Sequence, residues 1–494
     1  MNLLHPSDSE SSAFGESGTT PIPGDRFHFS PVATLLSALV LFGSVLFIVW
    51  LHVSVPPVNR IPSPERALAR MVGRTMELKT AVSGAPAWEQ WLYAMTIDTG
   101  ENDLPLAIAW YEELAASSAD PLVEFHLAVL EGEAGRSARI EEKSLAWTHR
   151  GDPFPFFARV VRAAYLEMPL PHAEESALQA RLAEVLPAGW FYDRLAIRLA
   201  ERAGDTALQA AADASLQTRA APLLRRVRVL TAIELLLIIG GLIALWYVVK
   251  ISRGGADSRF PVGAAPIPPP WPVRAGVEVL LRGGAFGVLI AMAFVFTNVD
   301  DPWIRLSVMP LAGLPLLIMA QRHLLIPASL GFAEGLGLTL VESGGRRLIV
   351  ALAALVAAGL LGEWALSTLG TWLDLSTHWT EWFDPDLVWG ETSVLIISLI
   401  EFVVFAPLLE ELTFRGLLFG TLRRQFGPGL SIFLSAAVFA GAHGYGVLGF
   451  ASVFWSGLLW AWMYEKTGSL LPGMSAHALN NLLVCMTLIW LLRT

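Results

Sequence analysis

The chain has 494 residues, of which 54% are apolar and only 16% charged, and 34 Lys and Arg against 44 Asp and Glu give a formal net charge of −10. So small a charged fraction argues against a wholly soluble protein. The single cysteine, Cys485, excludes an internal disulfide framework and a cysteine-based metal cluster. The acidic balance, without a basic cluster beside aromatic residues, argues against nucleic acid as a partner.

The chain opens with a polar tail over residues 1–30 and an apolar stretch over residues 31–55. A transmembrane helix needs about 20 apolar residues to cross the hydrocarbon layer of a bilayer. The stretch is too long for the core of a signal peptide, and no basic segment precedes it. We therefore expect a cytoplasmic tail followed by a retained transmembrane anchor.

Residues 56–226 have the composition of a soluble helical domain, rich in Ala, Leu, Glu and Arg. Apolar residues recur at three- and four-residue steps in 87–95, 104–115 and 121–134, and Gly, Asp, Ser or Pro close each segment. This pattern predicts stacked helical hairpins, similar to a repeat array but without a fixed period. Such a domain could be a structural or oligomerisation module, or a docking surface for a protein partner or substrate.

The remainder of the chain predicts a polytopic membrane bundle. Residues 227–251 form the second predicted span, and residues 252–275 are a Pro- and Gly-rich segment that we interpret as a linker. Residues 276–494 contain the other apolar segments, at 277–297, 303–320, 348–369, 392–424, 430–443, 447–464 and 470–492. The predicted fold is all-α, with about nine membrane spans and an inserted soluble helical domain.

Basic residues predict the orientation, because short loops rich in Lys and Arg stay in the cytoplasm. If the spans alternate, one side of the membrane collects Lys250, Arg253, Arg259, Arg274, Arg322, Arg346, Arg347, Arg423, Arg424 and Lys466. The N-terminus is then cytoplasmic, and the C-terminus and residues 56–226 are extracytoplasmic. The opposite side carries an aromatic segment with Trp372, Trp379, Trp382 and Trp389, which we interpret as an interfacial belt. The bias toward Arg over Lys favours a multi-pass protein of a bacterial inner membrane.

Ionisable side chains inside membrane spans cost about 2.5 to 3.5 kcal/mol each at a helix centre, so they suggest a functional site. Glu410 lies fourteen residues before Arg424, and His443 lies thirteen residues after Leu430. A turn joins these two helices, and each residue lies about 20 Å along its own helix from that turn. The two side chains should therefore lie at the same depth in the membrane. His477 and Asn481 are four residues apart on a third helix and share one of its faces.

A carboxylate, two imidazoles and an amide in one dry volume suit the hydrolysis of an acyl bond. Glu410 could act as general base toward a water that His443 shares, while His477 and Asn481 donate hydrogen bonds to the oxyanion. Alternatively, Glu410, His443 and His477 could hold a divalent metal such as zinc that activates the water. The sequence has no H-E-x-x-H motif. We favour the arrangement without a metal, and the sequence leaves both open.

Three motifs follow one another in the apolar segments: E-E-x-x-x-R at 410–415, F-x-x-x-H at 439–443 and H-x-x-x-N at 477–481. In this order they resemble the CPBP family, which comprises the CAAX prenyl endopeptidases and the bacterial Abi and bacteriocin-processing proteins. The resemblance covers about residues 392–492 and leaves out the domain before residue 227.

The resemblance implies that residues 276–494 are an intramembrane endopeptidase domain acting on a peptide or protein within the lipid bilayer. The family is often described as metalloproteases. Carried over by motif position, Glu410 and His443 would activate water and His477 and Asn481 would stabilise the oxyanion. The supporting residues would be Glu411, Arg415 and Phe439.

Two functions from other classes compete with this interpretation. A proton-coupled membrane transporter could relay protons through Glu401, Glu410 and His443. A non-catalytic membrane scaffold could use residues 56–226 to recruit partners. Cleavage that depends on Glu410 would separate the peptidase from both.

Overall fold

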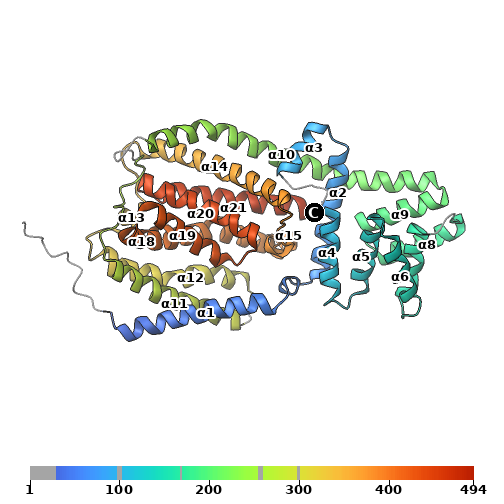
Figure 1. The fold of residues 1–494 in the computed structure, drawn as a ribbon, viewed down its shortest axis with the longest axis horizontal. Helices are drawn as coiled ribbons and strands as arrows, with labels where there is room; N and C mark the ends of the chain where they lie inside the picture. The colour runs from blue at the N-terminus through green and yellow to red at the C-terminus, as the bar shows by residue number, and fades with distance from the viewer. Residues whose placement is uncertain (1–28, 97–102, 167–169, 254–259, 298–300, 494) are drawn as a thin grey trace, which may run out of the picture.

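The computed structural model describes residues 29–96, 103–166, 170–253, 260–297 and 301–493. Most of the predicted polar tail therefore lies outside the described residues. Within them, eight helices are long and apolar enough to cross a membrane. The long helices lie side by side, with a separate group of shorter helices at one end (Figure 1). This arrangement confirms the prediction of an all-α polytopic membrane bundle.

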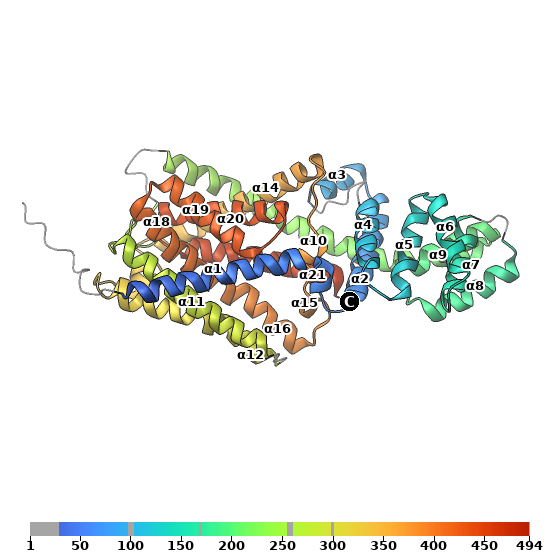
Figure 2. The same ribbon diagram turned by 60° about the horizontal axis from the view of Figure 1, so that its bottom comes forward.

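The spanning helices follow the apolar segments of the sequence. They are α1 (Pro31–Ser54), α10 (Thr206–Ser252), α11 (Val273–Thr297), α12 (Pro302–Ala320), α14 (Gly344–Trp372), the composite helix Thr392–Gln425, α20 (Val447–Thr467) and α21 (Leu471–Leu492). The π-helical turn η2 (Gln321–Leu325) extends α12, and the short α13 (Phe332–Gly335) follows it. Helix α1 lies along α11 at the edge of the bundle (Figure 2).

The remaining predicted span, at 430–443, is a helix that is shorter than the others. It is α19 (Pro428–His443), with 16 residues. At 1.5 Å per residue it is about 24 Å long, less than the hydrocarbon thickness. Gly444 ends it in the left-handed conformation, with φ of 67°, which glycine adopts without steric penalty. The chain turns back there into α20, and the half-buried His443 is the last residue of α19.

Two π-helical segments interrupt the composite helix Thr392–Gln425. Its parts are α16 (Thr392–Ile400), η4 (Glu401–Phe405), α17 (Ala406–Glu410), η5 (Glu411–Phe419) and α18 (Gly420–Gln425), of which η4 and η5 are π-helical. Pro407 has no N–H to donate, and η4 ends two residues before it, at Phe405. Such π-helical segments are frequent at functional sites.

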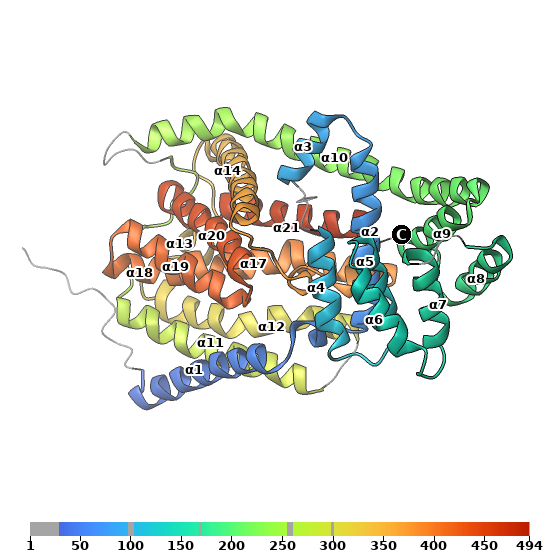
Figure 3. The same cartoon turned by 45° about the vertical axis from the view of Figure 1, so that its right-hand side comes forward.

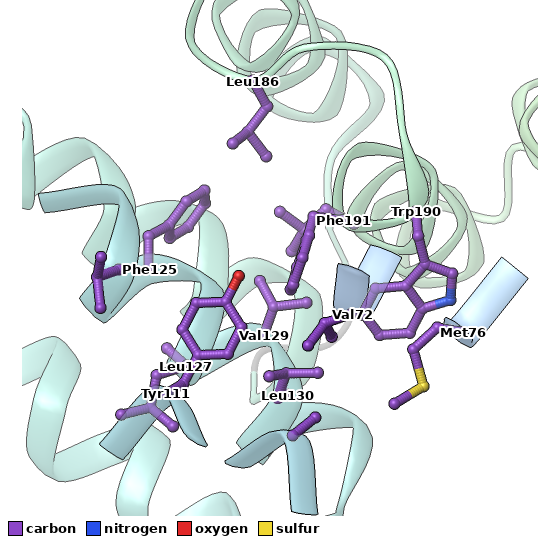
Figure 4. Packing of buried hydrophobic residues seen from close by; sticks show 14 of the residues in the cluster. Val72, Met76, Tyr111, Phe125, Leu127, Val129, Leu130, Leu186, Trp190 and Phe191 are labelled. Atoms are coloured by element: carbon purple, nitrogen blue, oxygen red, sulfur yellow. The ribbon is translucent and has the colours of Figure 1, made fainter. Parts of the chain in front are cut away.

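The helical domain lies at one end of the bundle. It consists of η1 (Pro57–Arg60), α2 (Pro64–Ser83), α3 (Ala87–Thr96), α4 (Asp103–Ala115), α5 (Pro121–Glu133), α6 (Ser137–Trp147), α7 (Phe154–Tyr165), α8 (His172–Val185) and α9 (Trp190–Ala203). Its core gathers aromatic side chains from different helices, among them Tyr111, Phe125 and Phe191 (Figure 4). Phe125 stacks on Phe157 with 4.1 Å between ring centroids. These large buried side chains supply the apolar area that holds the short helices together.

Helix α10 connects this domain to the membrane bundle without a break. Its 47 residues begin at Thr206, packed against α9 and α2, and continue to Ser252, packed against α14. The boundary that we predict between residues 226 and 227 thus falls inside one continuous helix. The domain and the second span share a rigid element.

The described part of the predicted linker is packed against the bundle. The Phe260 N–H donates to the Lys466 carbonyl at 3.0 Å, and the Val262 N–H donates to the Thr467 carbonyl at 2.9 Å. Trp271 is 2% exposed. Residues 260–272, part of the predicted Pro- and Gly-rich linker, are therefore a non-helical strap that is hydrogen-bonded to the bundle.

The helical domain docks on the last turn of α21. The four final carbonyls of a helix have no partner within it. Arg226 donates to the Trp490 carbonyl at 2.8 Å, and Arg70 donates to the Leu492 carbonyl at 2.8 Å. These two cations also lie at the negative end of the helix dipole, which they stabilise.

Residues 373–391 complete this docking surface. They contain η3 (Trp379–Glu381) and α15 (Pro385–Trp389). His378 Nε2 lies 3.0 Å from a carboxylate oxygen of Glu113 in α4.

Trp379 is fully buried in the same cluster as the domain core. Arg66 of α2 lies over the ring of Trp389 at 4.6 Å. The predicted interfacial belt is therefore wrong for Trp379 and Trp389, which pack against protein, whereas Trp372 is 81% exposed.

The bundle has two unlike ends. The domain end holds the helical domain, residues 373–391 and the end of α21, with α2 and α4 standing across it (Figure 3). The basic end holds the start of α1, the strap 260–272 and the turns at 326–343, 426–427 and 468–470. The described members of the predicted cytoplasmic basic set lie near this end, and Arg259 lies outside the described residues.

Candidate active site

The motif residues converge from three parts of the membrane bundle. Glu410 ends α17, and Glu411 and Arg415 lie in η5. Phe439 and His443 lie on α19, and His477 and Asn481 lie on α21. A fourth helix, α20, adds Trp460, which the motif analysis does not contain.

Glu410 and His477 form the central pair of the site. Oε2 of Glu410 lies 3.7 Å from Nε2 of His477. This separation is longer than a hydrogen bond and leaves the two atoms facing one another with unused capacity. Oε2 of Glu410 is buried and has no hydrogen-bond partner. The gap is shorter than two hydrogen bonds laid end to end, so a water bound to both groups would lie beside the pair and not between them.

The imidazole of His477 is held in one orientation by two neighbours. Its Nδ1 lies 3.2 Å from Oε1 of Glu411. An ionised carboxylate can only accept, so Nδ1 carries the hydrogen. The ring of Trp460 stacks on the imidazole, with 4.1 Å between centroids and 21° between planes. Together they direct Nε2 toward Glu410.

Glu411 also forms a buried ion pair with Arg415. Nη1 of Arg415 lies 2.8 Å from Oε1 of Glu411, and the two side chains are 0% and 1% exposed. The guanidinium lies over the ring of Phe439 at 4.0 Å, and over that of Trp460 at 5.1 Å. Such cation–π contacts are strongest where both partners are removed from water. The pair therefore forms a rigid base beneath His477.

Two glycines leave room for this ion pair. A Cβ at Gly473 of α21 would lie 3.2 Å from Oε2 of Glu411, and a Cβ at Gly457 of α20 would lie 3.2 Å from Nη2 of Arg415. These distances are tighter than ordinary carbon contacts. Small residues at these positions let three helices approach the charged pair closely.

His443 lies at the end of α19 that faces the helical domain. Its Nδ1 lies 2.8 Å from the Phe439 carbonyl, which can only accept, so Nδ1 donates and Nε2 remains available. The ring packs against Phe439 and Tyr445, with centroid distances of 4.8 and 5.6 Å. His443 is within electrostatic range of Glu410. Phe439 also contacts His477, with 6.0 Å between centroids, so one phenyl ring touches both imidazoles.

The amide of Asn481 compensates for the break at Pro407. In η4 the Ala406 N–H bonds to the Glu401 carbonyl, and Pro407 has no N–H for the next carbonyl, that of Phe402. Nδ2 of Asn481 donates to this Phe402 carbonyl at 2.9 Å. A buried carbonyl without a donor is costly, so Asn481 replaces the missing helical hydrogen bond. The amide nitrogen carries a second N–H.

The structure thus joins most of the predicted residues through direct contacts and places Asn481 on a backbone carbonyl. Glu410, Glu411, Arg415, Phe439, His443 and His477 form one connected cluster. Trp460 is the contact that sequence reasoning misses. A tryptophan in an apolar helix has the same local pattern whether it faces lipid or an imidazole, so no signal in the sequence distinguishes it.

The residues proposed as metal ligands do not gather around one point. Among the described residues, the ligand atoms of Glu410, His443 and His477 do not all lie within 4.8 Å of one another. Ligands of a single zinc ion lie about 2.0 to 2.3 Å from it and are therefore closer together. In this arrangement the three side chains do not fit one ion.

Beyond the cluster, the turn after His443 contacts the loop at the domain end. A Cβ at Gly446 would lie 2.9 Å from Oε1 of Glu381. The His378 N–H donates to the same oxygen at 3.4 Å, and His378 in turn contacts Glu113 of the helical domain. The domain is thus connected through residues 378–381 to the chain beside His443.

Comparison with known proteins bears on this part of the chain. The family model of the type II CAAX prenyl endopeptidase Rce1-like proteins matches residues 392–483, a range that contains every residue of the predicted site. No curated protein and no solved structure gives a significant match to the chain. The eight apolar helices make the chain a multi-pass membrane protein. Residues 392–483 thus match the CPBP/CAAX protease family.

Proposed function

We propose that this protein is an intramembrane endopeptidase of the glutamate type, which hydrolyses a peptide bond with water activated by Glu410. The family match supports a CAAX-protease-like endopeptidase in general. The observation that carries the finer assignment is the buried, unpartnered Oε2 of Glu410, which faces Nε2 of His477 across 3.7 Å.

Glu410 acts as the general base in this proposal. A water bound to the Glu410 carboxylate beside His477 attacks the carbonyl carbon of the scissile peptide bond and transfers a proton to Glu410. The protonated Glu410 then gives that proton to the departing amine. Proton transfer by a positioned group is typically worth about 10² to 10⁴ in rate.

His477 supplies the positive charge that the oxyanion needs. Glu410, Glu411 and Arg415 together carry one net negative charge in a site removed from water, and a protonated His477 balances it. An imidazolium donates from both ring nitrogens, so Nε2 can donate to the oxyanion while Nδ1 stays on Glu411. One such donor is commonly worth about 10² to 10³ in rate.

His443 and Asn481 assist at the two sides of this pair. His443 lies within electrostatic range of Glu410 and presents Nε2, because Nδ1 is held by the Phe439 carbonyl. It can therefore accept a hydrogen bond from the attacking water. Asn481 holds the backbone of the helix that carries Glu410, and its second N–H is suited to the oxyanion.

The ligand atoms of Glu410, His443 and His477 do not all lie within 4.8 Å of one another, which supports a reaction without a bound metal. Chelator treatment of the purified protein, with its metal content measured, tests this part separately. Activity that survives removal of all divalent metal agrees with the glutamate type. Activity that is lost with the metal and returns with zinc contradicts it.

We further propose that the basic end is cytoplasmic and that residues 56–226 lie on the other side of a bacterial inner membrane, where they dock a substrate or partner protein. The basic residues gathered at one end of the bundle support this orientation.

The function is tested with purified protein in detergent and a mixed peptide library. Cleavage by the wild type, abolished by Glu410→Gln and by His443→Ala, is the expected result. The control is Glu234→Gln, which removes another membrane carboxylate, on α10. Cleavage that persists in Glu410→Gln would reject the assignment.

A further inference from the structure

A second cluster of metal-binding groups lies in the helical domain, far along the chain from the protease motifs. His172 and Glu175 lie three residues apart in the first turn of α8, and Asp205 precedes α10. One ring nitrogen of His172 and one carboxylate oxygen each of Glu175 and Asp205 all lie within 4.8 Å of one another. Residues three apart on a helix share a face, so both α8 side chains reach toward Asp205.

Glu175 is buried within this cluster, beside a second carboxylate, that of Asp205. Glu175 is 2% exposed, and its Oε1 is inaccessible and has no hydrogen-bond partner. A buried carboxylate beside a second carboxylate is costly unless a cation joins them.

Asp205 has one oxygen committed and one available. Its Oδ1 accepts hydrogen bonds from the Ala207 and Leu208 N–H groups, at 3.0 and 2.9 Å, and so caps the N-terminus of α10. Capping uses a single oxygen. Oδ2 is therefore free to act as a ligand from a position that the cap holds fixed.

A further orphaned side chain lies one turn along α8. Both amide atoms of Gln179 are buried without a hydrogen-bond partner. Gln179 is four residues after Glu175 and shares its helix face. Buried polar groups without partners are rare in native proteins, and an ion or an ordered water is a common reason for them.

We propose that His172, Glu175 and Asp205 bind a divalent cation of the zinc class. One imidazole and two carboxylates suit zinc or a similar borderline ion better than calcium or magnesium, which prefer oxygen ligands alone. Water completes the coordination. The exposed side chain of His172 can turn toward the two carboxylates, which are held by burial and by the helix cap.

The ion joins α8 to the first turn of α10. Because α10 runs for 47 residues from this point into the membrane bundle, the ion fixes the domain to the helix that carries it. Its role is structural, and it is independent of the chemistry at Glu410.

The test uses the full-length protein in detergent, with Glu410→Gln and His443→Ala introduced to remove the active site as a source of bound metal. The probe is zinc alone, measured by equilibrium dialysis and elemental analysis. We expect about one zinc per chain, a higher melting temperature with zinc than without it, and no such shift with magnesium.

Three further substitutions make the test specific. Glu175→Gln and Asp205→Asn should each weaken zinc binding at least tenfold, although Asn keeps the helix cap. Glu175→Gln should melt no lower than its parent in the absence of zinc, because it removes a buried charge beside a second carboxylate. His149→Ala, an exposed histidine of the same domain, should leave zinc binding unchanged. Absence of bound zinc, or equal binding in Glu175→Gln and Asp205→Asn, overturns the proposal.

Discussion

His477 contacts Glu410 and Glu411 with different ring nitrogens. Its Nδ1 lies 3.2 Å from Glu411, and its Nε2 lies 3.7 Å from Glu410. The shorter contact anchors the ring, and the longer one leaves Oε2 of Glu410 without a hydrogen bond. Two neighbouring carboxylates of the E-E-x-x-x-R motif thus have different tasks, one structural and one chemical.

The ion pair beneath His477 predicts a strong and asymmetric effect on stability. Arg415→Leu leaves the Glu411 carboxylate buried without its cation, and breaking such a pair commonly costs about 3 to 5 kcal/mol. We expect a large drop in the melting temperature of the detergent-solubilised protein. The double variant Glu411→Leu/Arg415→Leu should recover part of that loss, because no unpaired charge remains. Equal melting temperatures for the single and double variants would contradict this account.

Asn481 and Pro407 should behave as a coupled pair. Asn481→Leu leaves the Phe402 carbonyl without a donor, and an unsatisfied buried group costs about 1 to 3 kcal/mol. Pro407→Ala restores a backbone N–H that can serve this carbonyl, so the double variant should regain stability. Thermal unfolding of the four proteins in the cycle measures the coupling.

The same cycle separates the two roles of Asn481. If its second N–H also serves the oxyanion, the cleavage rate of the stable double variant stays about 10² to 10³ below that of Pro407→Ala. Additive stability effects, with no coupling between the two positions, would show that Asn481 does not replace the helical hydrogen bond.

The helical domain should lose stability in mild acid because of His126. Burial lowers the pKa of His126 to about 3, from 6.5. The unfolded chain then binds the proton more readily than the folded one, so stability is complete above about pH 6.5 and falls as the pH drops toward 3. At pH 5 the loss relative to pH 7.5 is about 2 kcal/mol.

Hydrogen exchange of residues 121–133 at the two pH values measures this loss. His126 stacks on Phe191 at 3.9 Å, so His126→Phe keeps an aromatic ring there and should reduce the pH dependence. His149→Phe, at an exposed position, should leave it unchanged. The same pH dependence in His126→Phe and the wild type would assign it to other groups.

Thiol labelling checks the proposed orientation. In a chain with Cys485→Ala, single cysteines replace exposed residues at each end, His149→Cys in the domain and Arg424→Cys at the basic end. A maleimide that cannot cross membranes should label intact cells without an outer membrane only at position 149. Labelling at position 424 alone would reverse the topology.

The sequence predicts those features of the fold that depend on local patterns. Hydropathy locates the spans. The number of helical residues between each of Glu410, His443 and His477 and the nearest turn then predicts that the three lie at a similar depth. The span at 430–443 is harder to predict, because α19 is apolar along its whole length and yet has only 16 residues.

The features that hydropathy misses depend on tertiary contacts. Nothing near residue 226 signals that α10 passes unbroken from the domain into the membrane, and its interior even contains Pro222. The strap 260–272 has the composition of a loop and is fixed by hydrogen bonds to residues 466–468. Trp379 has the pattern of an interfacial residue, but the docked domain buries it.

The central claim, that Glu410 activates water for peptide hydrolysis, is tested most directly in cells. Peptide termini are compared between cells that produce the wild type, Glu410→Gln and the control Glu234→Gln at equal levels. The account predicts a set of termini present with the wild type and the control and absent with Glu410→Gln. The same termini in all three strains would contradict it.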